Sequence, residues 1–280
     1  MAKIVAAYTV PHTPSFIAEV AQNGVASPTA GIFATIKAHL DEINPDLLIL
    51  IQNDHFNTFF LDNWPTFALG VAERTCGPSD QTPEMPQYEV TIAQPLARHL
   101  LSSLVENDFD FSASQEFDVD HAVLVPLHFL TPTMAVPIVP VFINCLVPPL
   151  PSARRCYRLG STIKTAVERW PQPIRVAVIA SGSLSLEVGG PLIEPGKTFG
   201  VPDPEWASWI LDMLRSCRHN ELVAAATSER MAQAGNVGGE LLNWIGLLGI
   251  TGRRAPEILI NQPELGNAFA AWTLAKRGEV

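Results

Sequence analysis

Runs of apolar residues that alternate with helical patterns constrain the fold of this chain most strongly. Residues 46–52 (DLLILIQ) and 174–181 (IRVAVIAS) have the near-continuous apolar character of strands that are covered on both faces. Further strands are expected at residues 3–10, 66–73 and 137–146. Because buried strands of this kind need helices on both faces of their sheet, they indicate an α/β protein.

Helical patterns lie between most of these strands. The clearest is the amphipathic segment 152–170. Asp203 followed by Pro204 begins a helix to about Cys217, since an N-cap residue and a proline at the first helical position favour helix initiation. A strongly apolar helix is expected over 240–250. The remaining expected elements are helices over 28–42, 88–107, 120–130 and 221–234, a helical tail from residue 266, and a half-exposed strand over 109–117.

The regular strand–helix order predicts one domain. No repeat, low-complexity tract or obvious linker interrupts it. We therefore expect a single α/β domain over residues 1–280, with a central, mostly parallel sheet flanked by helices. In such sheets, binding sites form beyond the carboxyl ends of the strands.

The composition of the chain excludes two classes of protein. With 47% hydrophobic and 16% charged residues, the chain is too apolar for a disordered polymer. Its net charge of -10 argues against nucleic acid as a partner, because binding a phosphate backbone needs a basic surface. Four scattered cysteines and a start without a secretory pattern predict reduced thiols and a cytoplasmic location.

The segment 122–153 contains no Asp, Glu, Lys or Arg. On charge alone it could cross a bilayer, which needs about 20 apolar residues. However, seven prolines interrupt the segment, and each one removes a backbone donor and disfavours a helix interior. We therefore expect a short helix, a turn and a buried strand here, and no membrane partner.

Three polar side chains follow the predicted elements where the carboxyl edge of the sheet should lie. His12 follows the first strand, His55 follows the DLLILIQ strand, and Glu240 stands at the front of the apolar helix. Two histidines and one carboxylate can occupy one face of an octahedral ion and leave positions open for substrate and dioxygen. This is the pattern of non-haem Fe(II) oxygenases.

Simpler explanations exist for each of these residues. A histidine after a strand can be a loop residue that bonds a backbone carbonyl. A glutamate at a helix start is favoured by the helix dipole alone, and Asp54 and Asn57 can be turn formers. His121, at a predicted helix start, is either a solvated residue beside a helix cap or an acid–base group that faces the site.

Two other kinds of site find little support in the sequence. The segment 181–186 (SGSLSL) follows the clearest strand, but it lacks the complete strand–G-x-S-x-G–helix elbow of a serine hydrolase. The glycine-rich turns at 189–190 and 235–239 match neither G-x-G-x-x-G nor a phosphate-binding loop, so nucleotide binding is not expected.

Five motifs together resemble the type III extradiol dioxygenases, and most closely the catalytic beta subunit of protocatechuate 4,5-dioxygenase, the LigB type. They are PHTP around His12, NDHFNTFF around His55, DHA at His121, SGSLSLEVGGP from Ser181 and GNVGGELLNW around Glu240. The resemblance covers nearly the whole chain in the right order, and the run that begins NDHFNTFF is its most specific part.

The resemblance implies both a cofactor and a reaction. His12, His55 and Glu240 would hold Fe(II), and His121 would hydrogen-bond or protonate the substrate and oxygen intermediates. The substrate would be a catecholic aromatic such as protocatechuate, gallate or an O-methylated relative. Dioxygen would open its ring beside, not between, the two hydroxyl groups. Asn57, Ser183 and Leu186 are expected in the substrate pocket. A homo-oligomer, or a heteromer with a small alpha-type subunit, is also expected.

One position departs from the family pattern. Leu186 stands where the family usually carries a proton-transferring histidine, and such a group typically contributes about 10²–10⁴ in rate. His121 or Glu187 could take over, or the substrate could do without this base. The chain could also be a weakly active or non-catalytic metal-binding subunit. A metal-dependent hydrolase that uses the same pocket is a third possibility.

Overall fold

Within residues 1–275, which the computed structural model describes, eight strands form the central sheet in the order β11-β12-β1-β8-β2-β7-β3-β6. Its four central strands are mutually parallel and buried along nearly their whole length. They are β1 (Lys3–Val10), β8 (Arg175–Ser181), β2 (Leu47–Gln52) and β7 (Ile138–Ile143). This arrangement confirms the expected α/β class and the mostly parallel sheet.

Two strands on each side extend this parallel centre. β12 (Asn267–Thr273) pairs antiparallel with β1 and with β11 (Ile258–Gln262). On the other side, β3 (Phe67–Gly70) runs antiparallel to β7, and β6 (Ser112–Ser114) runs parallel to β3. The strands expected at 66–73 and 109–117 are therefore shorter than predicted.

The helical tail expected from residue 266 is wrong for the part that the structure describes. Residues 267–273 form β12, and six of these seven residues are buried. The segment adopts an extended conformation because the free side of β1 offers backbone donors and acceptors that only a strand can satisfy. The end of the expected tail, residues 276–280, lies outside the described residues.

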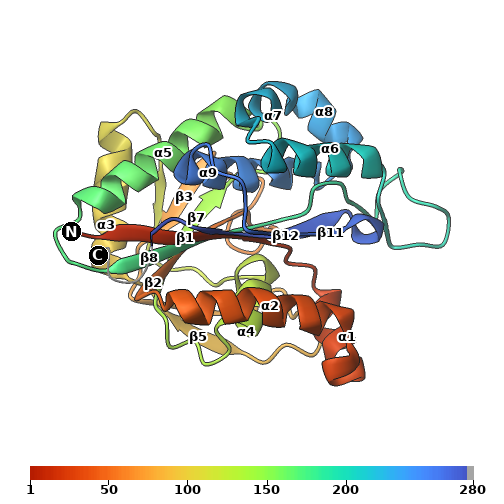
Figure 1. The fold of residues 1–280 in the computed structure, drawn as a ribbon, viewed down its shortest axis with the longest axis horizontal. Helices are drawn as coiled ribbons and strands as arrows, with labels where there is room; N and C mark the ends of the chain where they lie inside the picture. Colours follow the sequence, from red (N-terminus) through yellow and green to blue (C-terminus); the bar gives the residue numbers. More distant parts are fainter. Residues whose placement is uncertain (276–280) are drawn as a thin grey trace.

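Helices cover both faces of the sheet (Figure 1). One face carries α1 (Ser15–Asn23), α2 (Pro28–Ile43) and α4 (His121–Leu130). The other face carries α3 (Gln94–Glu106), α5 (Ala153–Arg169), α6 (Pro204–Arg215), α7 (His219–Ala225), α8 (Ser228–Gln233) and α9 (Leu241–Thr251). The sheet is thus the middle of three layers, which explains why its central strands are apolar on both sides.

Short elements complete the fold. Two small antiparallel pairs form, β4 (Arg74–Gly77) with β5 (Tyr88–Thr91) and β9 (Glu187–Val188) with β10 (Phe199–Gly200). Three single 3₁₀ turns occur in the described part of the chain, namely η1 (Gly24–Ala26), η2 (Gly238–Glu240) and η3 (Pro263–Leu265).

Two expected helices have different bounds in the structure. The pattern at 88–107 divides into strand β5 and helix α3, because Pro95 takes a position in the first turn of the helix, where its missing N–H costs nothing. The pattern at 221–234 is interrupted between α7 and α8, where the side chain of Thr227 caps the second helix by accepting a hydrogen bond from Arg230 N.

The charge-free segment 122–153 forms a short helix, a turn and a buried strand, as expected. It comprises most of α4, which contains Pro126, and the whole of β7. None of the helices within residues 1–275 has the length and apolar character that a bilayer crossing requires.

Helices α9 and α5 touch backbone to backbone. A Cβ atom added at Gly160 would lie 1.8 Å from the carbonyl oxygen of Gly246, and one added at Gly249 would lie 2.0 Å from that of Tyr157. All eleven residues of α9 are buried between the sheet and this contact. Since α9 continues directly from η2, which contains Glu240, the contact fixes the height of that carboxylate over the sheet.

We expect Gly160→Ala to destabilise the protein by about 1–3 kcal/mol, because the added methyl group must push the two helices apart in a packed core. The free energy of unfolding in urea measures the change. Gly31→Ala, on helix α2 with nothing within 4 Å of the added Cβ, is the matched control and should be neutral or slightly stabilising. Equal stability of the Gly160→Ala variant and the unmodified protein would contradict the close helix contact.

Candidate metal centre

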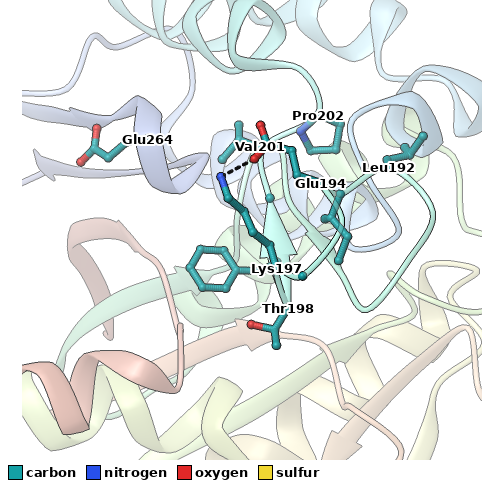
Figure 2. Close-up of a pocket in the computed structure, with 11 residues that line it drawn as sticks. Leu192, Glu194, Lys197, Thr198, Val201, Pro202 and Glu264 are labelled. Carbon is teal, nitrogen blue, oxygen red and sulfur yellow. Dashed lines mark ion pairs between the residues drawn. The ribbon is translucent and has the colours of Figure 1, made fainter.

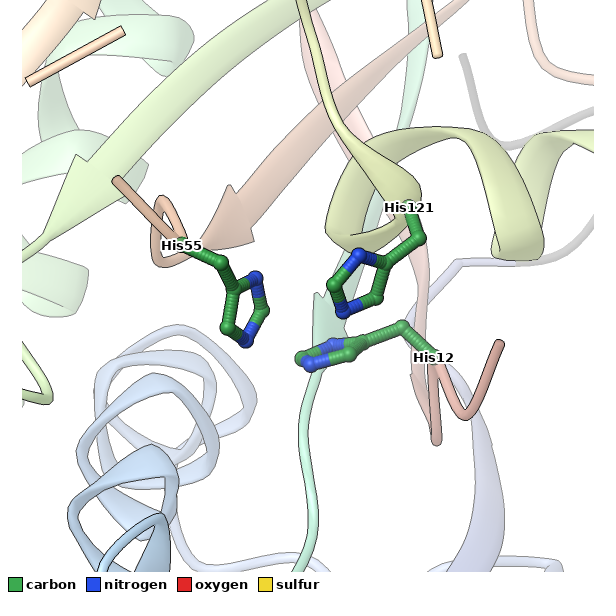
Figure 3. A group of neighbouring side chains, drawn as sticks. All are labelled: His12, His55 and His121. Atoms are coloured by element: carbon green, nitrogen blue, oxygen red, sulfur yellow. The ribbon is translucent and has the colours of Figure 1, made fainter. Parts of the chain in front are cut away.

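Strands β1, β2 and β8 end at the same edge of the sheet, and the candidate residues lie at this edge. His12 follows β1 by two residues and His55 follows β2 by three. His121 is the first residue of α4, from one face of the sheet, and Glu240 ends η2, from the other face. Figure 3 shows the three imidazole rings turned toward one another at this edge. The structure therefore brings these four side chains together.

The side chains are close enough to share an ion. Glu240 Oε1 lies 3.0 Å from His12 Nε2 and 3.4 Å from His55 Nε2. One ring nitrogen from each of His12, His55 and His121 lies within 4.8 Å of the other two. Ligand atoms bound at about 2.1 Å from a common ion lie about 3 Å apart when they occupy neighbouring positions. Both Glu240 distances fit that geometry, so this group can bind a metal.

His12 is held in the tautomer that a metal needs. Its Nδ1 lies 3.1 Å from the Ser181 hydroxyl, which in turn donates to the carbonyl oxygen of Ala122 at 3.0 Å. Because the hydroxyl hydrogen is already committed to Ala122, Ser181 accepts a hydrogen bond from His12 Nδ1. His12 Nε2 then faces the site, 3.0 Å from Glu240 Oε1, and would offer its lone pair to a bound ion, as in most histidine-ligated metal centres.

The other two histidines are anchored in the same way, but by carboxylates. His55 Nδ1 lies 3.0 Å from Asp120 Oδ2, and His121 Nδ1 makes a short hydrogen bond to Asp80 Oδ2. Each ring therefore presents Nε2 toward the others. An outer carboxylate that orients the ring and raises its basicity is the usual partner of a metal-binding histidine.

The backbone around Gly182 fixes the Glu240 carboxylate. Ser183 N donates to Glu240 Oε2 at 2.7 Å. A Cβ atom at Gly182 would lie 2.7 Å from the Glu240 Cβ, and Gly182 has a φ of 144°, which residues with side chains rarely adopt. Only glycine allows the end of β8 to approach the glutamate this closely.

The charges in the cluster lower the pKa of Glu240 and raise the pKa of His55. Glu240 is only 1% exposed. Burial would raise its pKa, but His12 and His55 outweigh burial and hold the pKa of this carboxyl well below its usual range. Burial would likewise lower the pKa of His55, yet Asp120 and then Glu240 raise it to about 10. Without a metal, His55 therefore carries a proton that a bound cation would replace.

His121 differs from His55 in its charge. Burial and the positive charge of His55 lower the pKa of His121, although Asp80 and Asp120 act in the opposite direction. The ring is therefore neutral at neutral pH. A neutral ring whose Nδ1 is bonded to Asp80 can accept a proton at Nε2.

A cavity of about 420 Å³ opens on the cluster, and it contains two of the three expected pocket residues. Ser183 and Leu186 line it together with His12, His55, His121 and Glu240. Asn57 is not among its lining residues. Its amide instead donates to the carbonyl oxygen of His55 at 3.0 Å and to Asp120 at 3.3 Å, so Asn57 supports the His55 loop from outside the cavity.

Two acidic residues near the site have structural roles. Asp54 accepts hydrogen bonds from the backbone N–H groups of residues 57–59, which supports its reading as a turn former. Glu187 accepts from Asn236 N at 2.5 Å and lines a different cavity. Because Glu187 lines this other cavity and not the one beside the histidines, it is badly placed to replace the missing family histidine.

The sequence reasoning missed the outer partners Asp80, Asp120 and Ser181. Asp120 precedes His121 and caps α4 by accepting from Ala122 N at 2.9 Å, so its position as a cap was the available signal. Asp80 lies in the β4–β5 connection, 41 residues from His121, and no local pattern links the two.

Residues 6–267 match the family described as the catalytic LigB subunit of aromatic ring-opening dioxygenase. A histidine–carboxylate cluster at the carboxyl edge of a mostly parallel sheet is a candidate metal site in an α/β fold. The match covers nearly all of the chain. The chain belongs to this family, which confirms the resemblance seen in its motifs.

Several curated relatives are named as dioxygenases. Gallate dioxygenase of Pseudomonas putida is 33% identical over 153 residues, which cover 54% of this chain and 43% of that protein. A 2,3-dihydroxyphenylpropionate/2,3-dihydroxicinnamic acid 1,2-dioxygenase of Xanthobacter autotrophicus is 29% identical over 222 residues, with 78% and 66% covered. The chain spans about half the length of the first relatives that it matches.

A solved structure has a similar fold. The uncharacterized protein JW3007 from Escherichia coli K12 aligns with a TM-score of 0.64 and 13% sequence identity, over 95% of this chain and 99% of that chain. At this identity the likeness supports the fold alone.

We expect Asp120→Asn to weaken metal binding by about 10–100-fold, the usual cost of losing the outer partner of a histidine ligand. Asparagine still caps α4, so the fold should persist. Anaerobic calorimetry with Fe(II) or Mn(II) measures the affinity. Asp118→Asn, an exposed neighbour on the same loop, is the control and should bind like the unmodified protein. Unchanged affinity in the Asp120→Asn variant would contradict the role of Asp120 as the outer partner of a metal-binding His55.

Proposed function

We propose that this chain, as a single domain over residues 1–280, catalyses the Fe(II)-dependent extradiol cleavage of a catecholic aromatic ring by dioxygen. The observation that carries the proposal is the convergence of His12 Nε2 and His55 Nε2 on Glu240 Oε1, at 3.0 and 3.4 Å, beside the 420 Å³ cavity. Relatives named for gallate and for 2,3-dihydroxyphenyl compounds support the same reaction, because each compound has adjacent ring hydroxyls. On the resemblance alone the substrate would be protocatechuate, gallate or an O-methylated relative, whereas the lining of the cavity bears on the substituent that the ring carries.

His12, His55 and Glu240 would hold the metal. Two neutral imidazoles and one carboxylate are the donor set of the non-haem Fe(II) oxygenases. When bound there, Fe(II) would supply the redox chemistry that the reaction of a catechol with dioxygen needs. The hydrogen bond from Ser183 N holds the Glu240 carboxylate in one orientation, so the protein provides this ligand without reorganisation.

His121 is the candidate acid–base residue. Its Nε2 faces the cavity while Nδ1–H donates to Asp80. Since burial lowers the pKa of His121, the neutral ring can accept a proton from a catechol hydroxyl and return it later in the reaction. Asp80 would hold the ring in that orientation and stabilise its charged form.

Leu186 favours a second, weaker candidate function. A leucine in the cavity wall can exclude water but cannot transfer a proton. A leucine at this position would therefore be expected in a non-catalytic or weakly active metal-binding subunit. The Asp80–His121 pair favours the active enzyme, because it places a complete acid–base group on the same cavity.

Anaerobic loading with Fe(II), followed by oxygen-electrode assays against a panel of catechols, tests the proposed function. We expect stoichiometric iron, oxygen uptake and a coloured ring-opened product. Glu240→Gln should lower kcat/KM by at least ~100-fold, because it removes the only anionic ligand of the proposed set. Glu168→Gln, exposed on α5, is the control. Full activity of the Glu240→Gln variant would overturn the proposal, and ester or amide cleavage without oxygen uptake would indicate a metal-dependent hydrolase.

We expect Leu186→His to leave turnover unchanged or lower it, because His121 backed by Asp80 already supplies proton transfer. Single-turnover and steady-state oxygen uptake measure the effect. A gain of about 10²-fold or more, the scale of a restored acid–base group, would show instead that the chain is a weakened enzyme that has lost its base.

We also propose that the enzyme works as a homo-oligomer or together with a small alpha-type subunit. Size-exclusion chromatography with light scattering distinguishes these states.

A further inference from the structure

The outer wall of the catalytic cavity is apolar. Beyond the histidine cluster, its lining side chains come from the loop after β1, from the β9–β10 region, from η3 and from the residue before η2. They are Pro14, Leu186, Val188, Phe199, Val237 and Leu265. Val188 is 51% exposed and Phe199 is 44% exposed, so these two lie at the mouth. A ring bound at the metal centre would direct its substituent toward this apolar wall.

Among residues 1–275, the lining of the cavity offers no lysine or arginine to an acidic substituent. Its ionisable lining groups are the three histidines and Glu240, while Asp80 and Asp120 stand directly behind two of the rings. A carboxylate on the substrate would lose its hydration and would meet no permanently charged partner, which is a costly arrangement.

Lys197 is a cation close to this cavity in the chain, but it is engaged elsewhere. It lies between β9 and β10, next to Thr198 and Phe199, which line the cavity. Its Nζ pairs with Glu194 Oε2 at 2.7 Å, and its side chain borders an adjoining hollow of about 660 Å³, which shares Thr198 and Phe199 with the cavity (Figure 2). Lys197 therefore forms an exposed ion pair with Glu194 and does not line the catalytic cavity.

The remaining polar lining groups are neutral. Thr13, Ser15, Ser183 and Thr198 contribute hydroxyl groups. These groups can bond an ether, ester or hydroxyl oxygen, but they do not supply a counter-charge. A cavity of about 420 Å³ falls within the ~300–1,000 Å³ range of pockets that enclose a whole small molecule.

We propose that the substrate is a catechol with an uncharged, apolar substituent, such as an alkyl or aryl group, rather than a carboxylated catechol such as protocatechuate or gallate. This inference rests on the proposed function and specifies the substrate class of the same site. Each methylene group that the wall removes from water should raise kcat/KM by about fourfold until the cavity is full.

Matched acid and ester pairs test the inference with the Fe(II)-loaded enzyme. Protocatechuate and gallate are compared with their methyl esters, and 4-methylcatechol with 4-ethylcatechol and 4-propylcatechol, by oxygen uptake. We expect each ester to exceed its acid by at least ~100-fold in kcat/KM, because the ester has no charge to desolvate. Acids that react as well as or better than their esters would overturn the inference.

Two variants separate the cavity wall from the neighbouring lysine. Phe199→Arg introduces a cation at the mouth and should reduce the preference for the ester by at least tenfold. Lys197→Met should leave the acid-to-ester ratio unchanged. If Lys197→Met selectively abolishes turnover of the acids, then Lys197 reaches the substrate and the inference is wrong.

The proposed function and this inference can fail separately. If no catechol consumes oxygen, the ring-cleavage proposal fails. Anaerobic calorimetry with the metal-loaded protein still compares each acid with its ester. Tighter binding of the ester would then support the apolar specificity of the cavity, and tighter binding of the acid would refute it.

Discussion

The buried contact between the Glu240 carboxylate and the two imidazole rings of His12 and His55 is the interaction on which the site depends. A carboxylate that is 1% exposed needs a positive partner. In the metal-free protein that partner is the proton on His55, since Asp120 and Glu240 raise the pKa of this ring to about 10 despite its burial. A divalent ion would take the place of that proton. The Ser183 N–H and the glycine at position 182 serve to keep the carboxylate where this exchange can occur.

The fold gives this cluster its rigidity. His12 and His55 follow β1 and β2, the parallel strands on either side of β8, whose register is set by backbone hydrogen bonds. Glu240 precedes a helix that contacts α5 through glycine backbone. The rings are then held from behind by Ser181, Asp120 and Asp80. Side chains that converge from both faces of the sheet therefore need little rearrangement to bind an ion, which is the arrangement that favours tight and specific metal sites.

The sequence predicts the strands and helices that local patterns encode. It does not reveal contacts between residues that lie far apart in the chain. Residues 46–52 and 174–181 are apolar on both faces, so their strands and the polar residues that follow them could be placed in advance. The sequence predicts a helix where β12 forms, because nothing in residues 267–273 indicates that one edge of β1 is free to pair with them. The role of Asp80 was equally hidden, since its connection between β4 and β5 reaches His121 only in the folded chain. The cavity wall illustrates the same limit, because Val188, Phe199 and Leu265 come together from separate turns.

His12, His55 and Glu240 are assigned to the metal and His121 to proton transfer. However, His121 lies close enough to His12 and His55 to be a ligand as well. X-ray absorption at the iron edge, measured on anaerobically loaded protein before and after His121→Ala, decides the point. We expect two imidazole nitrogens and one carboxylate oxygen from the protein at about 2.0–2.2 Å, unchanged in the His121→Ala variant. Loss of an imidazole from the iron in that variant, or a shell without the Glu240 oxygen, would contradict the assignment of His12, His55 and Glu240 as the metal ligands.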